Sequence, residues 1–133
     1  MEILQPGGWD PPKGYSNGVS VEGPGRTIYV AGQIAWNANQ KIVGAGDFAA
    51  QFEQALSNVV AVVASGGGGP EHIVRLTMYV LSTEAYMDSI KAVGASYREI
   101  IGRNFPAMAL VQVAGLLESQ ALIEIEATAF VPA

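Results

Sequence analysis

Two glutamates near the C-terminal end are the strongest candidates for chemistry in this sequence. Glu124 and Glu126 lie in the run LIEIEATAFV, residues 122–131, where strand alternation puts both on one face with Leu122 and Phe130. A carboxylate on such a face would be partly desolvated, which disfavours its charged form and suits it to proton transfer. Alternation alone fits a solvated sheet surface better than a functional site, so both interpretations stay open.

The other reactive side chains match no familiar catalytic or metal-binding pattern. The chain has no cysteine and one histidine, His72, so thiolate and two-histidine metal sites are excluded and no metal is expected. No serine stands in a Gly-x-Ser-x-Gly motif. The glycine run 66–69 follows an expected helix and lacks Gly-Lys-Ser/Thr, so we interpret it as a turn and not as a phosphate loop. His72 lies just past it, where we expect solvent exposure.

Charge and length exclude several classes of function. The 133 residues are most simply one domain, 1–133, and the net charge of -5, with seven scattered cations, leaves no basic surface for nucleic acid. The longest uncharged run, 54–70, contains too many glycines and polar residues for a membrane span. No leader-like segment is visible near the start. We therefore expect a cytoplasmic protein that needs neither nucleic acid nor membrane.

The composition indicates self-association. Charged residues make up 14% of the chain and apolar residues 50%, whereas about 25% of the residues are charged in an ordinary soluble domain. A domain of this length buries only about 70% of the surface of its unfolded chain. The surplus apolar surface predicts that copies of the chain associate.

Hydrophobic periodicity predicts a single α+β domain with the element order ββαβαββ. Residues 1–16 are rich in proline and glycine and are expected to form an irregular arm, anchored by Trp9. Gly23-Pro24-Gly25 is expected to join the first two strands as a hairpin. The expected strands are 17–22, 26–34, 73–82, 107–115 and 121–131, and the expected helices run from Asp47 to Gly66 and from Thr83 to Gly102.

We expect one mixed sheet with both helices packed on the same face, because right-handed crossovers place them there. The strand 107–115 is apolar on both sides, with Met108 and Leu110 on one and Ala109 and Val111 on the other. A strand of this kind suits burial on both faces. The face without helices is therefore predicted to meet a partner subunit.

Several short motifs, in this order and spacing, resemble the reactive intermediate deaminase family, also called the Rid or YjgF-like family. The resemblance covers almost the whole chain. It is carried by GYSNGV at 14–19, AGQI at 31–34, NFPA at 104–107, Val113 and IEIEA at 123–127.

The resemblance implies a chorismate-mutase-like fold and a homotrimer with ligand clefts between its subunits. It also implies an activity, the hydrolysis of a 2-imino or 2-enamino acid to a 2-keto acid and ammonium without a cofactor. By the same resemblance, Tyr15 matches a pocket tyrosine and Glu124 matches the glutamate that orients the water or handles its proton. Gly32 and the turn 105–107 match the framework of the cleft.

The chain departs from the family pattern at the residues that grip the substrate. Met108 stands where the family has an arginine for the substrate carboxylate, and Leu110 where a cysteine is common. Ala31 replaces a serine, and Gly94 a pocket asparagine. Loss of the guanidinium contact, worth about 1.5 to 3 kcal/mol, would weaken the binding of a small imino acid by one to two decades. The more apolar pocket suits a larger or aromatic ligand, or one whose carboxylate is absent or held by Arg75 or Arg103.

Three functions compete at this stage. The first is hydrolysis of an enamine or imine other than the simple 2-imino acids, with Glu124 handling the proton and with Tyr15, Ala31, Gly32, Met108 and Leu110 binding substrate. The second is a binding protein that holds a small metabolite in the same intersubunit cleft without converting it. The third, a ribonuclease or translation inhibitor, ranks lowest because the chain is acidic and has no pair of histidines.

Overall fold

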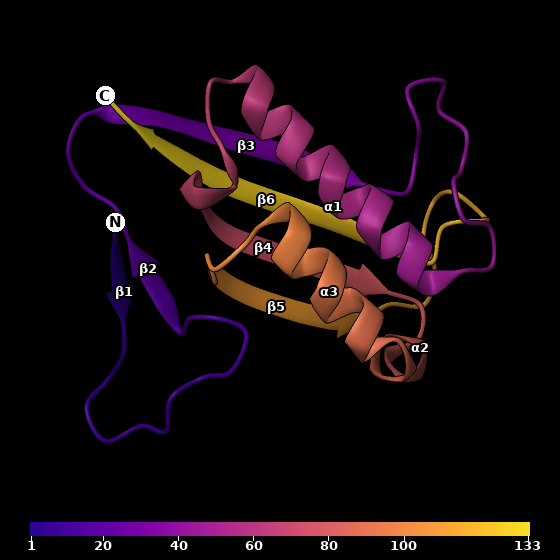
Figure 1. Ribbon diagram of the computed structural model, residues 1–133, viewed down its shortest axis with the longest axis horizontal. Helices are drawn as coiled ribbons and strands as arrows, with labels where there is room; N and C mark the ends of the chain where they lie inside the picture. The colour runs from indigo at the N-terminus through magenta and orange to yellow at the C-terminus, as the bar shows by residue number, and fades with distance from the viewer.

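A four-stranded mixed sheet lies at the centre of the fold, and the helices lie on one side of it (Figure 1). The computed structural model describes residues 1–133. The strand order is β3-β6-β4-β5, with β6 antiparallel to β3 and β4, and β4 parallel to β5. The elements are β1 (Glu2–Leu4), β2 (Gly18–Ser20), β3 (Gly25–Gln33), α1 (Phe48–Ser65), η1 (Pro70–His72), β4 (Ile73–Val80), α2 (Thr83–Asp88), α3 (Ile90–Ile100), β5 (Ala107–Gln112) and β6 (Ile123–Pro132).

Helix α1 forms where the sequence predicts it, with the predicted caps. The Asp47 side chain accepts a hydrogen bond from the Ala50 amide at 3.1 Å, and the helix ends at Gly66. Phe52, Leu56 and other apolar residues one helical turn apart are fully or almost fully buried against the sheet. This apolar stripe fixes the side of the sheet on which the helix lies.

The second predicted helix is divided in two, which the sequence did not indicate. Ser82, and not Thr83, is the N-cap of α2, and its hydroxyl accepts from the Ala85 amide at 3.0 Å. At Ser89 the backbone leaves helical geometry (ψ 9°), and α3 starts at the next residue. Serine favours caps over helix interiors because its side chain competes for backbone hydrogen bonds.

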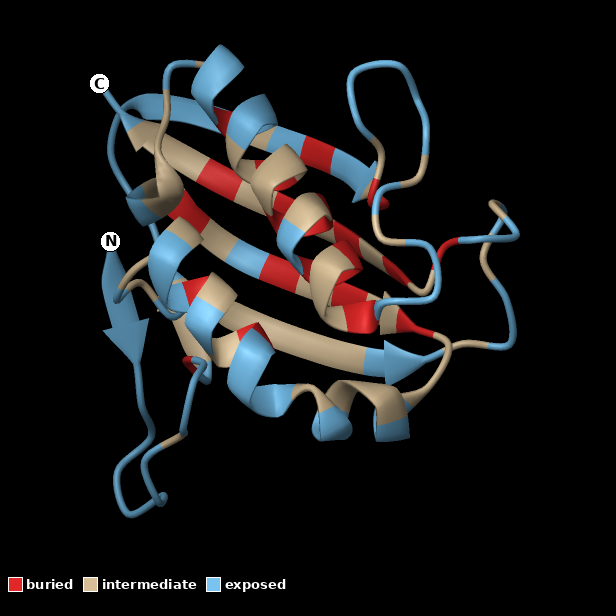
Figure 2. Cartoon of the chain, turned by 45° about the vertical axis from the view of Figure 1, so that its right-hand side comes forward, coloured by how far each residue is buried: buried red, intermediate tan, exposed pale blue.

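The side chains of β6 alternate between the buried, helix-covered face of the sheet and its open face. Ile123, Ile125, Ala127 and Ala129 are buried beneath the helices, and the residues between them are partly exposed on the other face (Figure 2). The buried Gln51 amide holds the entry to this strand, because its Oε1 accepts from the Leu122 amide at 2.8 Å.

The predicted hairpin between 17–22 and 26–34 is wrong. Strand β2 pairs with β1, in a small two-stranded sheet of its own, whereas β3 pairs with β6 (Figure 1). Short strands carry little pairing information, and the left-handed backbone at Gly23 (φ 88°) redirects the chain between them. The arm 1–16 is accordingly not irregular throughout, since it contains β1. Trp9, expected to anchor it, is 62% exposed.

Candidate functional site

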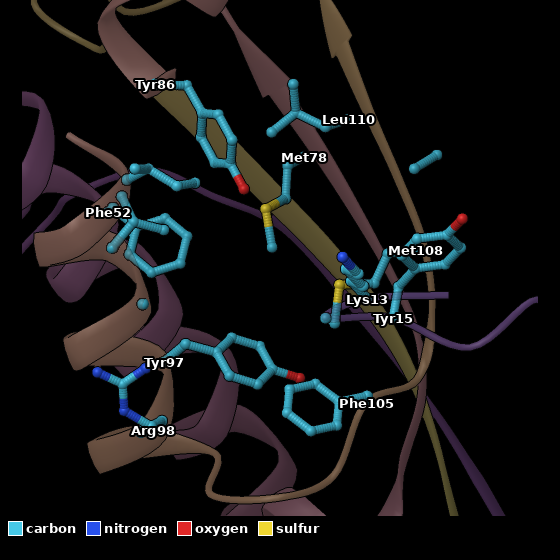
Figure 3. Close-up of a pocket in the computed structure, with 15 residues that line it drawn as sticks. Lys13, Tyr15, Phe52, Met78, Tyr86, Tyr97, Arg98, Phe105, Met108 and Leu110 are labelled. Carbon is cyan, nitrogen blue, oxygen red and sulfur yellow. The ribbon is translucent and has the colours of Figure 1, made fainter. Parts of the chain in front are cut away.

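A cavity of about 600 Å3 lies between the α2–α3 segment and strands β4 and β5 (Figure 3). Its walls are mostly apolar. Its lining includes Tyr15, Tyr86, Tyr97, Met108 and Leu110.

The register of the β4–β5 pair explains why two of the predicted substrate-binding residues face this cavity. Met108 pairs with Leu76 and Leu110 with Met78, and both partners are buried on the helix side of β4. Residues paired across a ladder project to the same face of a sheet. Met108 and Leu110 therefore point toward the helices.

Tyr15 reaches the mouth of the cavity because the residue after it is tied to the start of β5. The Ser16 amide donates to the Pro106 carbonyl at 3.1 Å, and the Ser16 hydroxyl donates to the Phe105 carbonyl. Ser16 is itself buried, while Tyr15 is 41% exposed. The N-terminal arm thus contributes to the same cavity as β5.

One wall of the cavity is a rigid aromatic pair. The rings of Tyr97 and Phe105 stack with centroids 5.7 Å apart, and the Tyr97 hydroxyl donates to the Asn104 carbonyl at 2.5 Å. The Asn104 amide in turn donates to the carbonyls of Pro70 and Ile73. Burial raises the pKa of Tyr97 well above its ordinary value, so this hydroxyl stays neutral and fixed. Tyr97 falls within the second predicted helix, 83–102, but the sequence gave no sign that it would line a cavity.

Tyr86 gives a second ring to the cavity, from α2. Its ring packs edge-on against Phe48, with centroids 6.2 Å apart, and its hydroxyl points into the space near Met78 (Figure 3). Burial raises the pKa of Tyr86, so its hydroxyl remains protonated at neutral pH. The cavity therefore contains neutral phenols. At position 108, where the family pattern has a guanidinium, it contains a thioether.

Glu124 lies on the other face of the sheet, next to β3. Ala31 and Gly32 form a bulge between the pairs Val30–Ala127 and Gln33–Ile125. A Cβ at Gly32 would lie 2.5 Å from Glu124 Oε2, so a side chain at position 32 would displace this carboxylate from its present position. Gly32 thus lies directly against the Glu124 carboxylate, and Ala31 precedes it in the same bulge.

The two glutamates of β6 differ in what holds them. The Tyr79 hydroxyl donates to Glu126 Oε1 at 2.6 Å, whereas the carboxylate of Glu124 accepts no hydrogen bond from the chain. The bond to Glu126 raises the pKa of Tyr79, with smaller contributions from burial and the neighbouring carboxylates. Glu126 is engaged within the subunit, and Glu124 is the carboxylate left free to act on another molecule.

The structure does not bring all the predicted site residues together in one chain. Tyr15, Met108 and Leu110 line the cavity on the helix side, but Ala31, Gly32 and Glu124 lie on the opposite face of the sheet.

The two arginines considered as substitute anchors also lie outside the cavity. Arg75 shares the face of Tyr79 and Glu124, and Arg103 is exposed away from the cavity lining. The cations that do line it are Lys13 and Arg98.

The remaining sequence candidates have structural roles. His72 is partly buried, not fully exposed as expected, and its Nδ1 accepts from the Gly69 amide at 2.9 Å, which closes the turn before β4.

No group of three or more His, Asp or Glu side chains lies close enough together to hold a metal ion. None of the helices combines the length and apolar character needed to cross a membrane.

Comparison with known proteins places this chain in a family. Residues 9–131 match the family described as Endoribonuclease L-PSP. The human protein named 2-iminobutanoate/2-iminopropanoate deaminase is 33% identical over 115 residues, which cover 86% of this chain and 78% of the relative. The chain therefore belongs to the Rid, or YjgF-like, family.

Solved structures agree with this assignment. The Rid-family protein YyfB from Yersinia pestis superposes with a TM-score of 0.82, at 35% identity and with 96% of each chain covered. The YjgF gene product of E. coli superposes with a TM-score of 0.65, at 33% identity and with 86% of each chain covered. The predicted α+β fold, with one mixed sheet and helices on one face, is confirmed.

Proposed function

We propose that this protein hydrolyses a reactive imine or enamine to a carbonyl compound and ammonium, at a site built by two copies of the chain. The observation that carries the proposal is the free carboxylate of Glu124, packed on Gly32, on the face opposite the cavity. Relatives named 2-iminobutanoate/2-iminopropanoate deaminase support the reaction type.

A second copy is needed because the sheet separates the two halves of the site. In a ring, each subunit can present its open sheet face to the cavity side of the next one, through a heterologous interface. Tyr29 and Val111 on that open face are 81% and 42% exposed, which supports its burial against a partner. We infer a homotrimer, the assembly that the family resemblance implies.

The reaction needs only water, a proton carrier and a bound substrate. Water adds to the carbon of the protonated C=N bond, and Glu124 accepts a proton as the new C–O bond forms. In the resulting carbinolamine, Glu124 returns the proton to nitrogen. The C–N bond then breaks as the C=O bond forms, Glu124 takes the hydroxyl proton, and this proton passes to the departing ammonia to give ammonium. The net change is protonated imine plus water to carbonyl compound plus ammonium. A protonated imine carbon is already electrophilic, so placing one water and excluding others supplies most of the remaining catalysis.

The substrate is expected to differ from the simple 2-imino acids. Met108 in the cavity has a thioether, which cannot make the bidentate contact that a guanidinium makes with a carboxylate. Leu110 beside it adds further apolar surface. The cavity accordingly favours a substrate with a substantial apolar group.

A panel of 2-imino acids, made in situ by an amino acid oxidase, tests this proposal. With added protein, we expect faster imine loss and less trapping by semicarbazide, most clearly for substrates with large side chains. Glu124→Ala should abolish this effect and leave the assembly intact, as sedimentation would show. An unchanged rate in Glu124→Ala would overturn the assigned mechanism.

A second candidate function is binding without conversion. It is favoured by the cavity itself, whose lining includes no carboxylate and no imidazole. A ligand that raises the melting temperature but is recovered unaltered after long incubation would support it. Release of ammonium from the same ligand would contradict it.

A further inference from the structure

The N-terminal arm brings one cation to the wall of the cavity that holds Met108. Lys13 is among the residues that line the cavity, and Figure 3 draws its side chain beside Met108. The guanidinium of Arg98, the other cation of the lining, lies on the opposite side of the cavity along α3. Lys13 is therefore the one cation at this wall.

The backbone around Ser16 holds Lys13 in this place. Ser16 forms a parallel bridge with Ala107, the residue that precedes Met108 in β5. Gly14 has a φ of 78°, in the left-handed region that glycine adopts at little cost, so the chain turns directly after Lys13. A short, turned segment thus ties Lys13 to the start of β5.

The ammonium of Lys13 has no acidic partner within the chain. The one ion pair of the structure joins His72 and Glu71. Lys13 is exposed, and no Asp or Glu lines the cavity. Its charge is therefore available to an anionic group of a ligand that enters the cavity.

The walls around this ammonium restrict the kind of ligand that fits. The stacked pair Tyr97–Phe105 offers a flat aromatic surface, and Met78 and Met108 offer adaptable thioethers. The volume of about 600 Å3 lies within the range that holds drug-sized ligands. Beside Met108 a single cation balances a single negative charge, and a second charge on the same group would stay unpaired at a cost. A carboxylate on an aromatic body meets these conditions.

We propose that Lys13 determines the specificity of this cavity. Its ammonium binds the carboxylate of a substrate whose aromatic body lies against the Tyr97–Phe105 pair. The thioether of Met108 beside it adds apolar contact without charge. The substrate class is the imine of an aromatic 2-oxo acid. The statement about turnover rests on the proposed function, but the statement about binding does not.

Binding of a stable 2-oxo acid tests the proposal without turnover. Calorimetry on the full chain would compare phenylpyruvate with phenylacetone, which carries a methyl group in place of the carboxylate. We expect the wild type to bind phenylpyruvate about tenfold more tightly, because a charge-assisted contact is added. Lys13→Gln should bring the two affinities to within about twofold of each other. Lys13→Arg keeps the positive charge and should retain the preference.

Arg98→Gln is the matched control, since it removes the other cation of the cavity, on the opposite side. Its preference for phenylpyruvate should stay within about twofold of the wild type, because salt screens a charge that does not contact the ligand. An equal loss of preference in Arg98→Gln and Lys13→Gln would overturn the proposal. It would also be overturned by an unchanged preference in Lys13→Gln, or by a wild type that binds neither ligand.

Turnover by the same variants separates this inference from the proposed function. Binding of phenylpyruvate that depends on Lys13, without hydrolysis of its imine, would contradict the proposed function and uphold the role of Lys13. Hydrolysis of aromatic imines with the same KM in Lys13→Gln and wild type would uphold the function and contradict the role of Lys13.

Discussion

The two faces of the sheet differ in chemistry although the same strands build both. The helix side holds an apolar cavity lined by Met108, whereas the open side holds the carboxylate of Glu124. On β6, Ile123 is wholly buried on the helix side and its neighbour Glu124 projects the other way. A single chain therefore keeps its cavity and its candidate proton carrier on opposite sides of one sheet, and in the proposed site a second copy brings them together.

The largest expected effect comes from mixing two inactive variants. Glu124→Gln should lower turnover by about 10²- to 10⁴-fold, the usual range for losing a general base. Gly94→Leu should block the cavity and abolish binding. In an equal mixture of the two variants after reassembly, about a quarter of the sites would join an intact cavity to an intact glutamate. Activity recovered in the mixture is the measurement.

Gly94→Ala serves as the control for the blocked cavity, because its small side chain should leave most of the space open. Reassembly of either variant with itself should restore nothing. If the mixture stays as inactive as its components while subunit exchange is demonstrated by mass spectrometry, the site is not shared between subunits.

A medium effect is expected on the cavity side alone. Met108→Arg would introduce a guanidinium that can make a charge-assisted contact with a substrate carboxylate. We expect the KM for a small 2-imino acid to fall by about tenfold or more, with kcat little changed. Met108→Leu, similar in volume, should leave the KM near its original value. A fall in KM with both variants would show that charge is not the cause.

A smaller effect is expected on the open face of the sheet, in the titration of Tyr79. The hydrogen bond to Glu126 is the main cause of the raised pKa of Tyr79, so Glu126→Gln should lower this pKa toward its ordinary value of 10.0. Phenolate absorbance followed during an alkaline titration should therefore rise at lower pH in the variant. Tyr79→Phe should remove that component of the titration. An identical titration in Glu126→Gln and wild type would show that this bond does not form in solution.

The smallest effect concerns the aromatic wall. Below its ordinary pKa of 10.0, Tyr97 is neutral in both the folded and the unfolded chain, so it adds no pH dependence. Above that value the unfolded chain binds fewer protons than the folded one, so the free energy of unfolding falls as pH rises. At neutral pH, Tyr97→Phe should unfold with a free energy about 1 kcal/mol lower than that of the wild type, because the bond to Asn104 is lost. Between about pH 9 and 11, the free energy of unfolding should fall less steeply with pH in the variant than in the wild type. Urea unfolding across that range is the test.

Local patterns were enough to predict α1 and the alternation of β6. The caps Asp47 and Gly66 and the spacing of Phe52 and Leu56 specify a helix and its buried side without reference to other segments. The short motifs around Tyr15 and Glu124 were likewise enough for the family. These features depend on neighbours in the chain, which the sequence displays directly.

The pairing of β2 and the break at Ser89 were not predictable in the same way. Three-residue strands can pair with any free edge, and β2 pairs with β1 and not with β3. At Ser89 the helix-like spacing of apolar residues continues from Tyr86 to Ile90, so the sequence pattern did not show that α2 ends and α3 begins there. Both outcomes depend on contacts between distant segments.

The sequence by itself determined the elements of this protein, its family and the identity of the residues that differ from the family pattern. Only the tertiary structure decided that Met108 and Glu124 lie on opposite faces and that Lys13 and Arg98, not Arg75 or Arg103, line the cavity. The physical reason is that alternation tells which residues of one strand share a face. The register between strands and the packing of α3 over β5 decide which residues from different elements lie on the same face of the sheet.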